Sequence, residues 1–207
     1  MNVSLFRKDF GAAGILAIAL TATCALAQAP RPDESKANAY SLNRDSSKFR
    51  FSIGHFVVSS TQGRFLSFDG TLRFDPQSPD RGTVVIHVAP GSISTDNEAR
   101  DEHLRSADFF DAQKFPSAMF ESTGLVRNPD GTGKVTGTLS LHGASRPITL
   151  DVTYRTLDPN ADVQRFSATG KLKRSEFGMT NYPGVIGDEV TLNIEAEFDR
   201  EHSSGGI

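Results

Sequence analysis

Histidine is the side chain best suited to acid–base catalysis at neutral pH and a common metal ligand. Four of the five histidines lie in the predicted elements, and they are spread along the chain. His55, His87, His103 and His142 lie in four different predicted elements, without the two-residue or four-residue spacing of common ligand pairs. His55 shares the apolar face of its predicted strand, where a histidine is usually a hydrogen-bonded core residue. A closed sheet could still gather two of these rings, but the pattern predicts neither a metal site nor a resident cofactor.

Acidic residues occur as close neighbours at three places, and a pair of carboxyl groups is the equipment of many hydrolases. Such catalysis needs the two groups to face one bond across a cleft, in contrasting environments. Acids that are neighbours on a polar helix or at a turn more often form a solvated surface. We therefore interpret these pairs as surface acids: Asp101 with Glu102, Asp108 with Asp111, and Asp188 with Glu189.

The motifs of common hydrolases and nucleotide-binding proteins are missing from this sequence. No Gly-x-Ser-x-Gly segment occurs, so an acyl hydrolase of the usual kind is not expected. Gly131 and Gly133 lie in a predicted turn between strands, whereas a phosphate-binding loop precedes a helix. The sequence thus predicts a protein that is not an enzyme.

Most of the chain alternates between apolar and polar residues, which is typical of β-strands with one buried face. Short turns separate these segments, and Asn128–Pro129–Asp130–Gly131 is the strongest turn signal. About eight segments show the alternation: residues 48–56, 64–75, 83–90, 118–128, 134–142, 146–155, 165–174 and 188–200.

One stretch in the middle of the chain departs from this alternation. Thr95 followed by Glu98 has the form of a capping box, which predicts the start of a helix. Pro116 ends the helical pattern. We therefore predict one short helical insert near residues 96–108, followed by three phenylalanines, that covers one end of the fold.

An antiparallel sheet fits these elements, because parallel strands need helical crossovers and only one helix is predicted. A single sheet of long strands leaves unpaired edges unless it closes. We therefore expect an all-β protein, an extended antiparallel β-barrel of about eight strands. The interior of such a barrel is either filled by its own side chains or able to hold one slim ligand, and the pattern leaves both open.

The first 27 residues have the composition of a secretory signal peptide. Arg7 and Lys8 form a positive region, an apolar stretch runs from Gly11 to Leu26, and Ala25–Leu26–Ala27 has the form of a cleavage site. The apolar stretch is short for a transmembrane helix, and nothing later in the chain is apolar enough to cross a membrane. The expected organisation is a cleaved signal peptide at 1–27, a flexible tether at 28–38, the barrel at 39–200 and a disordered tail at 201–207.

Composition narrows the classes of partner. Cys24, the sole cysteine, lies in the leader, so the mature chain has no disulfide. The formal net charge is −3, and a chain of this balance does not suit nucleic acid. Of the 15 phenylalanines only Phe6 and Phe10 fall in the leader, and there is no tryptophan. This favours an apolar interior that needs no polar partner, although a densely packed core would show the same composition.

Several motifs resemble the YceI-like family of exported, lipocalin-like proteins, in the same order along the chain from about Tyr40 to Phe198. The most specific is HLRSADFFD at 103–111, followed by Phe-Pro and by FEST; the others are FSIGHFVVSSTQGRFLSFDGTLRFDP, GTLSLHGASRPITLDV, RSEFGM and GDEVTLNIEAEF. The resemblance implies a lipocalin-like barrel with a helical segment near one end, holding a long polyisoprenoid, isoprenoid quinone or similar lipid. It implies no catalytic residues and no metal, and it favours the hollow barrel over the filled one.

In a hollow barrel, the inward-facing apolar side chains would line a tunnel for the lipid, and those of the insert would form its cover. The assignments follow strand parity, which a one-residue bulge would invert. The predicted lipid-binding residues are Phe49, Phe51, Ile53, Phe68, Leu72, Phe74, Leu104, Phe109, Phe110, Phe115, Phe120, Leu139, Ile148, Phe166 and Leu192.

We expect a non-catalytic protein of the periplasm that binds, stores or transports a long apolar lipid, without stable insertion into a membrane. Two alternatives stay open. A stress-linked scavenger of apolar small molecules would use the same cavity with looser selectivity, and a lipid-modifying enzyme would use His55, His142 or Asp108. A homodimer is compatible with the sequence, because paired barrels would extend an apolar surface, but no residue demands it.

Overall fold

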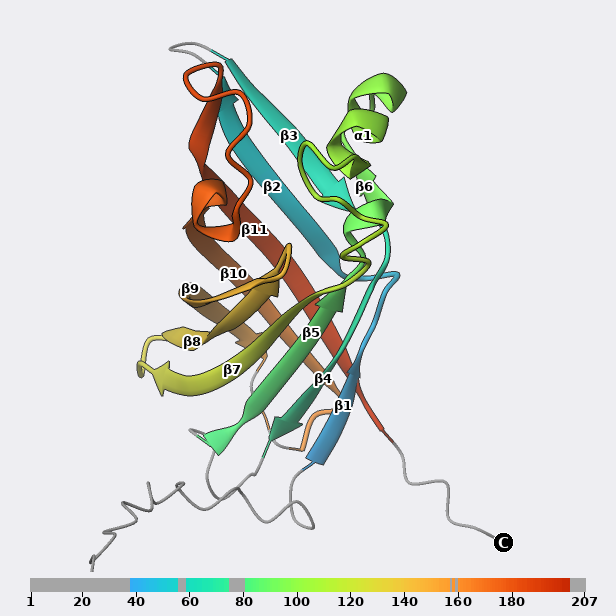
Figure 1. The fold of residues 1–207 in the computed structure, drawn as a ribbon. Coiled ribbons are helices and arrows are strands. Elements are labelled where there is room, and N and C mark those ends of the chain that lie inside the picture. Colours follow the sequence, from blue (N-terminus) through green and yellow to red (C-terminus); the bar gives the residue numbers. More distant parts are fainter. Residues whose placement is uncertain (1–37, 56–58, 75–80, 157, 159, 202–207) are drawn as a thin grey trace, which may run out of the picture. The chain divides into compact units, whose positions relative to one another are not determined.

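The structure, a computed structural model, describes residues 38–55, 59–74, 81–156, 158 and 160–201, which fall within one compact unit, Pro32–Ile207. The strands are β1 (Asn38–Leu42), β2 (Lys48–His55), β3 (Ser59–Phe65), β4 (Phe68–Phe74), β5 (Thr83–Val88), β6 (Ile93–Ser94), β7 (Ala118–Arg127), β8 (Thr132–Leu141), β9 (Ala144–Thr156), β10 (Val163–Lys173) and β11 (Ile186–Arg200). The helical elements are α1 (Glu98–Arg105) and the 3₁₀ helices η2 (Pro90–Ser92) and η3 (Arg174–Phe177) (Figure 1).

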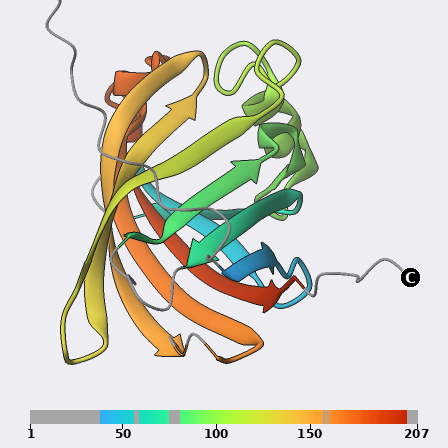
Figure 2. The ribbon, with the colours of Figure 1, turned by 90° about the horizontal axis from the view of Figure 1, so that it is seen from below.

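All the described strands belong to one antiparallel sheet that closes on itself. The order is β1–β4–β5–β7–β8–β9–β10–β11, and β11 pairs back onto β1, which completes a ring of eight strands (Figure 2). The predicted fold, an antiparallel β-barrel of about eight strands with one short helical insert, is therefore confirmed.

Two long stretches of the barrel wall are broken into halves. β1 pairs with the C-terminal end of β11, and β2 pairs with the N-terminal part of β11. β1 and β2 therefore lie one after the other along the same side of β11. β3 and β4 follow the same course, because β3 pairs with β2 and β4 with β1. Leu66, which lies in the break between β3 and β4, is 64% exposed. The β2–β3 pair thus continues the wall beyond the ring (Figure 1).

The predicted alternation is visible in the strand register. Phe51 on β2 lies directly opposite Leu192 on β11, and both side chains face the interior. Arg50, the next residue on β2, points outward, where its Nη1 donates to Glu195 Oε1 at 3.0 Å. A period of two therefore separates an apolar inner face from a charged outer face.

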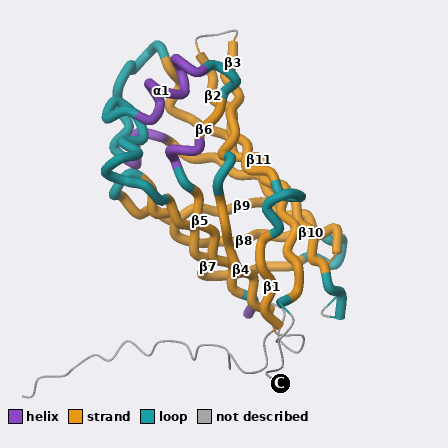
Figure 3. Tube along the Cα trace, turned by 90° about the vertical axis from the view of Figure 1, so that its right-hand side faces the viewer, coloured by secondary structure: helices purple, strands orange, loops and turns teal. Residues whose placement is uncertain are grey.

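The helical insert begins differently from the prediction. α1 lies within residues 96–108 but is shorter, and Asn97 caps it by accepting the N–H of Arg100 at 3.0 Å. The capping box is wrong, because the Thr95 hydroxyl donates to Asp101 Oδ1 at 2.5 Å instead. Asp101, interpreted as a surface acid, is buried and also accepts the N–H of Thr95 at 2.8 Å. Asn97 thus takes the predicted role of Thr95 as the cap, and Asp101 takes the predicted role of Glu98 as the acceptor for the N–H of Thr95. The side view shows α1 near one end of the barrel, beside β2, β3 and β6 (Figure 3).

The chain termini lie largely outside the described residues. The expected signal peptide (1–27) and nearly all of the expected tether and tail fall there, so these assignments stay predictions. Asn38, assigned to the tether, already begins β1 and lies opposite Phe74. Among the helices of the described ranges, none has the length and apolar character needed to cross a membrane.

Candidate functional site

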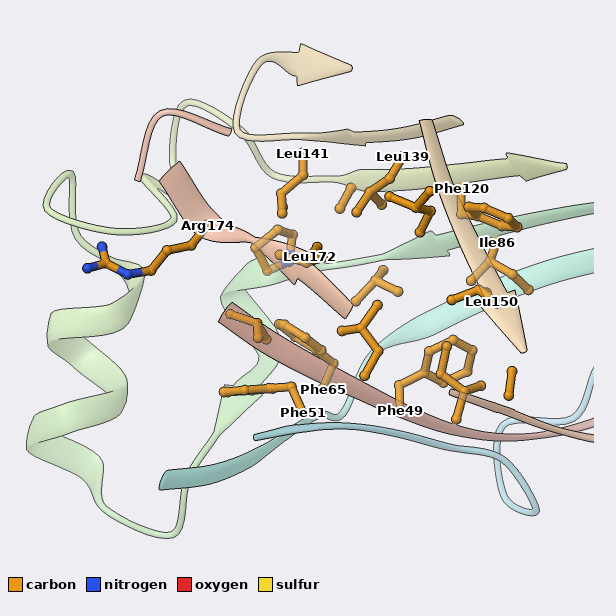
Figure 4. A pocket seen from close by; sticks show the side chains of 18 of the residues that line it. Phe49, Phe51, Phe65, Ile86, Phe120, Leu139, Leu141, Leu150, Leu172 and Arg174 are labelled. Carbon is orange, nitrogen blue, oxygen red and sulfur yellow. The ribbon is translucent and has the colours of Figure 1, made fainter. Parts of the chain in front are cut away.

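A cavity of about 470 Å³ lies inside the barrel, a volume typical of small-molecule binding sites. Side chains from β2, β3, β4, β5, β7 to β11 and α1 form its wall. The wall is almost wholly hydrocarbon, so the cavity suits an apolar guest far better than a polar metabolite. Figure 4 shows this wall, with Phe49, Phe51, Phe65, Ile86, Phe120, Leu139, Leu141, Leu150 and Leu172 around a common space.

Most of the side chains that the sequence assigned to lipid binding border this cavity. Whether they touch a lipid stays a prediction, but the fold brings them to one continuous surface from distant strands and from the insert. They are Phe49, Phe51, Ile53, Leu72, Leu104, Phe109, Phe110, Phe120, Leu139, Ile148, Phe166 and Leu192.

Two of the assigned residues, Phe68 and Phe115, do not border this surface, and for a third, Phe74, the prediction is not tested. Phe68 is buried, yet it packs against Phe49, with ring centroids 4.5 Å apart, and does not itself border the cavity. Phe115 packs against the ring of His142 at 4.8 Å, again away from the wall. The side chain of Phe74 lies outside the described part of the structure. Parity gives the face of a strand but not which of two stacked rings meets the void.

The cavity opens at the end that carries α1. Among the described residues of its wall, the exposed ones are Arg100 and His103 on α1 and Tyr182 and Val185 in the loop between η3 and β11. Tyr182 is 43% exposed and Val185 47%. Because a residue that borders both the cavity and solvent marks an opening, the mouth lies between α1 and this loop, as expected for an insert that covers one end.

Contacts between the two segments span this mouth. His103 Nε2 lies 3.0 Å from Asp108 Oδ2, and the hydroxyl of Tyr182 lies 3.4 Å from the same nitrogen. Asn181 Nδ2 donates to the carbonyl oxygen of Asp108, 73 residues away in sequence, at 2.8 Å. The ring of Phe109 stacks on that of Tyr182. His103, Asp108 and Phe109 belong to the most specific sequence motif, HLRSADFFD, but no periodicity indicated a role for Asn181 or Tyr182.

Arg174 is a further wall residue that sequence reasoning missed. It is 6% exposed, and its guanidinium donates to the backbone oxygen of Met179 in the loop between η3 and β11 at 2.6 Å, and to those of Ile186 at 3.2 Å and Gly187 at 2.9 Å at the start of β11. Its stem borders the cavity while its guanidinium points away from the apolar wall (Figure 4). Arg174 therefore holds the loop in shape. Its sequence signal was only its place in the RSEFGM motif.

The carboxylate of Asp188 holds the other side of this loop. It accepts the N–H of Ser175 at 2.9 Å and the Ser175 hydroxyl at 2.8 Å, at the start of η3. The N–H of Ser175 is the main cause that lowers the pKa of Asp188, and the positive charges of Arg174 and Lys173 contribute further. The mouth loop thus begins and ends on anchored residues.

Of the three groups that a lipid-modifying enzyme was expected to use, only His55 borders the cavity. His55 borders the cavity, and its Nε2 lies 2.7 Å from the Thr61 hydroxyl, as expected of a hydrogen-bonded histidine. His142 Nδ1 lies 2.9 Å from the carbonyl oxygen of Phe177, and neither His142 nor Asp108 borders the cavity. Within the described ranges, no three His, Cys, Asp or Glu side chains are grouped so that they could hold a metal ion.

Comparison with known proteins identifies relatives of this barrel. The YceI-like domain family matches residues 40–198. Protein YceI of Salmonella newport (strain SL254) is 37% identical over 150 residues, which cover 71% of this chain and 78% of that protein. The crystal structure of the Campylobacter jejuni YceI protein is similar with a TM-score of 0.61 and 31% identity, over 72% of this chain and 90% of that one. A polyisoprenoid binding domain from Saccharophagus degradans shares the fold, with a TM-score of 0.60 and 15% identity over 79% and 99% of the two chains.

Proposed function

The chain belongs to the YceI-like family, and we propose that it binds a long apolar lipid of the polyisoprenoid or isoprenoid quinone type inside its barrel. The observation that carries this proposal is the apolar cavity, enclosed by the barrel wall and open beside α1. A lipid tail would enter there and exchange water for the hydrocarbon wall. The fold shared with a polyisoprenoid binding domain supports the same class of ligand.

Burial alone is enough to hold such a tail. Each CH₂ removed from water contributes about 0.8 kcal/mol, so ten such groups contribute about 8 kcal/mol. Association costs of several kcal/mol reduce this sum, which leaves a tail of moderate length with useful affinity and a longer one with more. Binding of the tail therefore needs no charged side chain in the wall.

We further propose that the protein acts as a carrier or store in the periplasm and not as an enzyme. The leader-like residues 1–27 support export, and the almost wholly apolar wall, with neither His142 nor Asp108 on it, argues against these two groups acting on the bound lipid. A scavenger of mixed apolar molecules is the second candidate, because an apolar wall has few groups that select one head group over another.

Mass spectrometry of an organic extract from the purified full-length protein tests these functions. We expect one prenyl lipid, or one prenyl series, in near-stoichiometric amount. A mixture of unrelated apolar molecules would favour the scavenger, and a chemically altered lipid would favour the enzyme. An extract without any lipid, together with failure of the delipidated protein to bind prenyl alcohols, would overturn the proposal.

A matched pair of variants ties the ligand to the cavity. Ile148 borders the cavity, whereas its neighbour Thr149 is exposed on the outer face of β9. Ile148→Asp places a charge on the apolar wall and should abolish lipid co-purification, while Thr149→Asp should leave it unchanged. Far-UV circular dichroism of both variants checks that the sheet is intact. Equal lipid content in the two variants would show that the ligand lies elsewhere.

A further inference from the structure

A polar cluster of Tyr40, Gln164 and Arg200, here called the floor cluster, lies at the end of the barrel opposite the mouth. Tyr40 on β1 and Gln164 on β10 are both fully buried. The Tyr40 hydroxyl accepts hydrogen bonds from Gln164 Nε2 at 3.3 Å and from Arg200 Nη2 at 3.2 Å. Three strands of the ring thus meet through one hydroxyl group.

The floor cluster is also bonded to the loop between β9 and β10. Tyr40 donates its hydroxyl hydrogen to the carbonyl oxygen of Ala161 at 3.2 Å, which Arg200 Nη2 also reaches at 3.2 Å. Gln164 Nε2 donates to the carbonyl oxygen of Asp158 at 2.5 Å. The guanidinium of Arg200 lies over the Tyr40 ring, 5.4 Å from its centroid. The side chains of the cluster are therefore held in fixed positions by several hydrogen bonds and one cation–π contact.

The strand register places the floor cluster directly beneath the cavity. Phe198 on β11 borders the cavity and lies opposite Gln164 on β10, so both side chains face inward. Arg200 follows two residues later on the same face, opposite Tyr40. None of the three cluster residues borders the cavity. On β10 and β11 the apolar space therefore ends at the level of Phe166 and Phe198, with polar groups below it, whereas the cavity wall extends to Gly82, just before β5, and to Tyr154 on β9.

A hydrocarbon tail has no means of passing this layer. Its terminal methyl would have to separate the hydrogen bond between the fully buried Gln164 and Tyr40 side chains, which would find no water to replace it. Breaking such bonds costs more than burying one further CH₂ contributes. Each added unit of tail therefore gains affinity only until the tail reaches Phe198.

We propose that the floor cluster sets the greatest tail length that the protein binds, so that the barrel selects among prenyl lipids by chain length. The inference rests on the proposed function and adds to it a specificity determinant. The head group stays at the mouth, because the opening lies at that end, and the tail is measured from there to the floor.

Two alanines in the wall allow the cavity to be shortened from its inner end, because a larger side chain at either position would fill it at a known depth. Ala196 lies on β11 two residues before Phe198, and Ala168 on β10 lies opposite Ile194, one layer nearer the mouth. Successive inward layers of a strand are about 7 Å apart along its direction. A phenylalanine at either alanine would project into the cavity at a different depth. Thr169, exposed on the outer face of β10, provides the matched control.

The test titrates delipidated full-length protein with all-trans prenyl alcohols that differ by one isoprene unit, through displacement of an apolar fluorescent probe. For the unaltered protein we expect affinity to rise severalfold per unit up to a limiting length and then to stop rising. Ala196→Phe should move the limit to a shorter alcohol and Ala168→Phe to a still shorter one, while Thr169→Phe leaves it unchanged. Gln164→Ala, which removes part of the floor, should move the limit to a longer alcohol.

Thermal melting of each variant, with and without the shortest alcohol that binds, shows whether the barrel is folded. Affinity that keeps rising with length, or a limit that is the same in all four variants, would overturn the inference and leave the proposed function standing. Failure of the unaltered protein to bind any prenyl alcohol would overturn the proposed function, and the inference with it.

Discussion

The ring of Phe109 stacks on the ring of Tyr182 across the mouth of the cavity, with centroids 5.7 Å apart and planes 14° from parallel. Phe109 is buried in the turns that follow α1, while Tyr182 is half exposed in the loop before β11. Both rings border the cavity. A lipid that passes between α1 and this loop must separate the two rings or move around them. We therefore expect the stack to slow the passage of the ligand through the mouth.

Removing the Tyr182 ring should speed the exchange of ligand. An aromatic pair contributes about 0.5–1.5 kcal/mol, so Tyr182→Ala should raise the dissociation rate of a fluorescent lipid by about two- to tenfold. Tyr182→Phe is the matched control, because it keeps the stack and loses only the long hydroxyl contacts at 3.4 and 3.5 Å. Stopped-flow transfer to an excess of acceptor protein measures the rate. Equal rates for the two variants would show that the stack does not slow the passage of the ligand.

The buried carboxylate of Asp101 should carry a large share of the stability of the insert. It accepts both the N–H and the hydroxyl of Thr95, and hydrogen bonds to a charged group contribute about 1.5–3 kcal/mol each at most. We expect Asp101→Asn to lower the free energy of unfolding by about 1–3 kcal/mol in urea titrations. Glu102→Gln, at the exposed neighbour on α1, should change it by less than about 0.5 kcal/mol. A loss of the same size in both variants would contradict the role given to Asp101.

Two glycines in left-handed turns separate backbone strain from side-chain packing. Gly131 has φ 84° and Gly143 φ 76°, so alanine at either site should cost about 1 kcal/mol from the backbone alone. A Cβ at Gly143 would lie 2.8 Å from Phe115 Cε1, whereas the nearest atom at Gly131 is 3.7 Å away. Gly143→Ala should therefore be the more destabilising in thermal unfolding. Equal losses would show that Phe115 yields without cost.

Asp188 should make stability depend on acid pH. Hydrogen bonds from Ser175 lower the pKa of this carboxyl group in the folded state below its unfolded value near 4. Its contribution is therefore complete above the unfolded pKa and is lost as pH falls through the folded pKa. Because Asp188 is exposed, the effect is modest. The difference in Tm between the unaltered protein and Asp188→Asn should be largest near pH 6 and shrink towards pH 3. A constant difference over this range would contradict the assignment.

Much of the barrel could be predicted because strand parity is a local property. The alternation of residues 48–55 correctly placed Phe49, Phe51 and Ile53 on one face, and Arg50 on the other. The single change of period correctly located the helical insert. The cap of this insert was predicted wrongly. Thr95 is hydrogen-bonded to Asp101, six residues later, because the chain bends between them, and no capping pattern describes that contact.

The site depended more heavily on packing between distant segments. Phe68 and Phe49 have the same parity signal, but only the closed sheet shows that Phe49 meets the cavity and Phe68 packs against it. The same holds for Tyr182, whose loop has no periodicity at all. Contacts of this kind are set by which strands become neighbours, and no window of sequence contains that information.

The antiparallel β-barrel, its apolar inner face and the short insert at one end could all be predicted from local patterns, because they follow from the period of two and its one interruption. The cavity inside the barrel, its mouth between α1 and the loop before β11, and the contacts among Tyr40, Gln164 and Arg200 at the other end became visible only in the folded chain. The physical reason is that a void, a mouth and a floor each arise from side chains brought together by ring closure, across separations that local patterns do not encode.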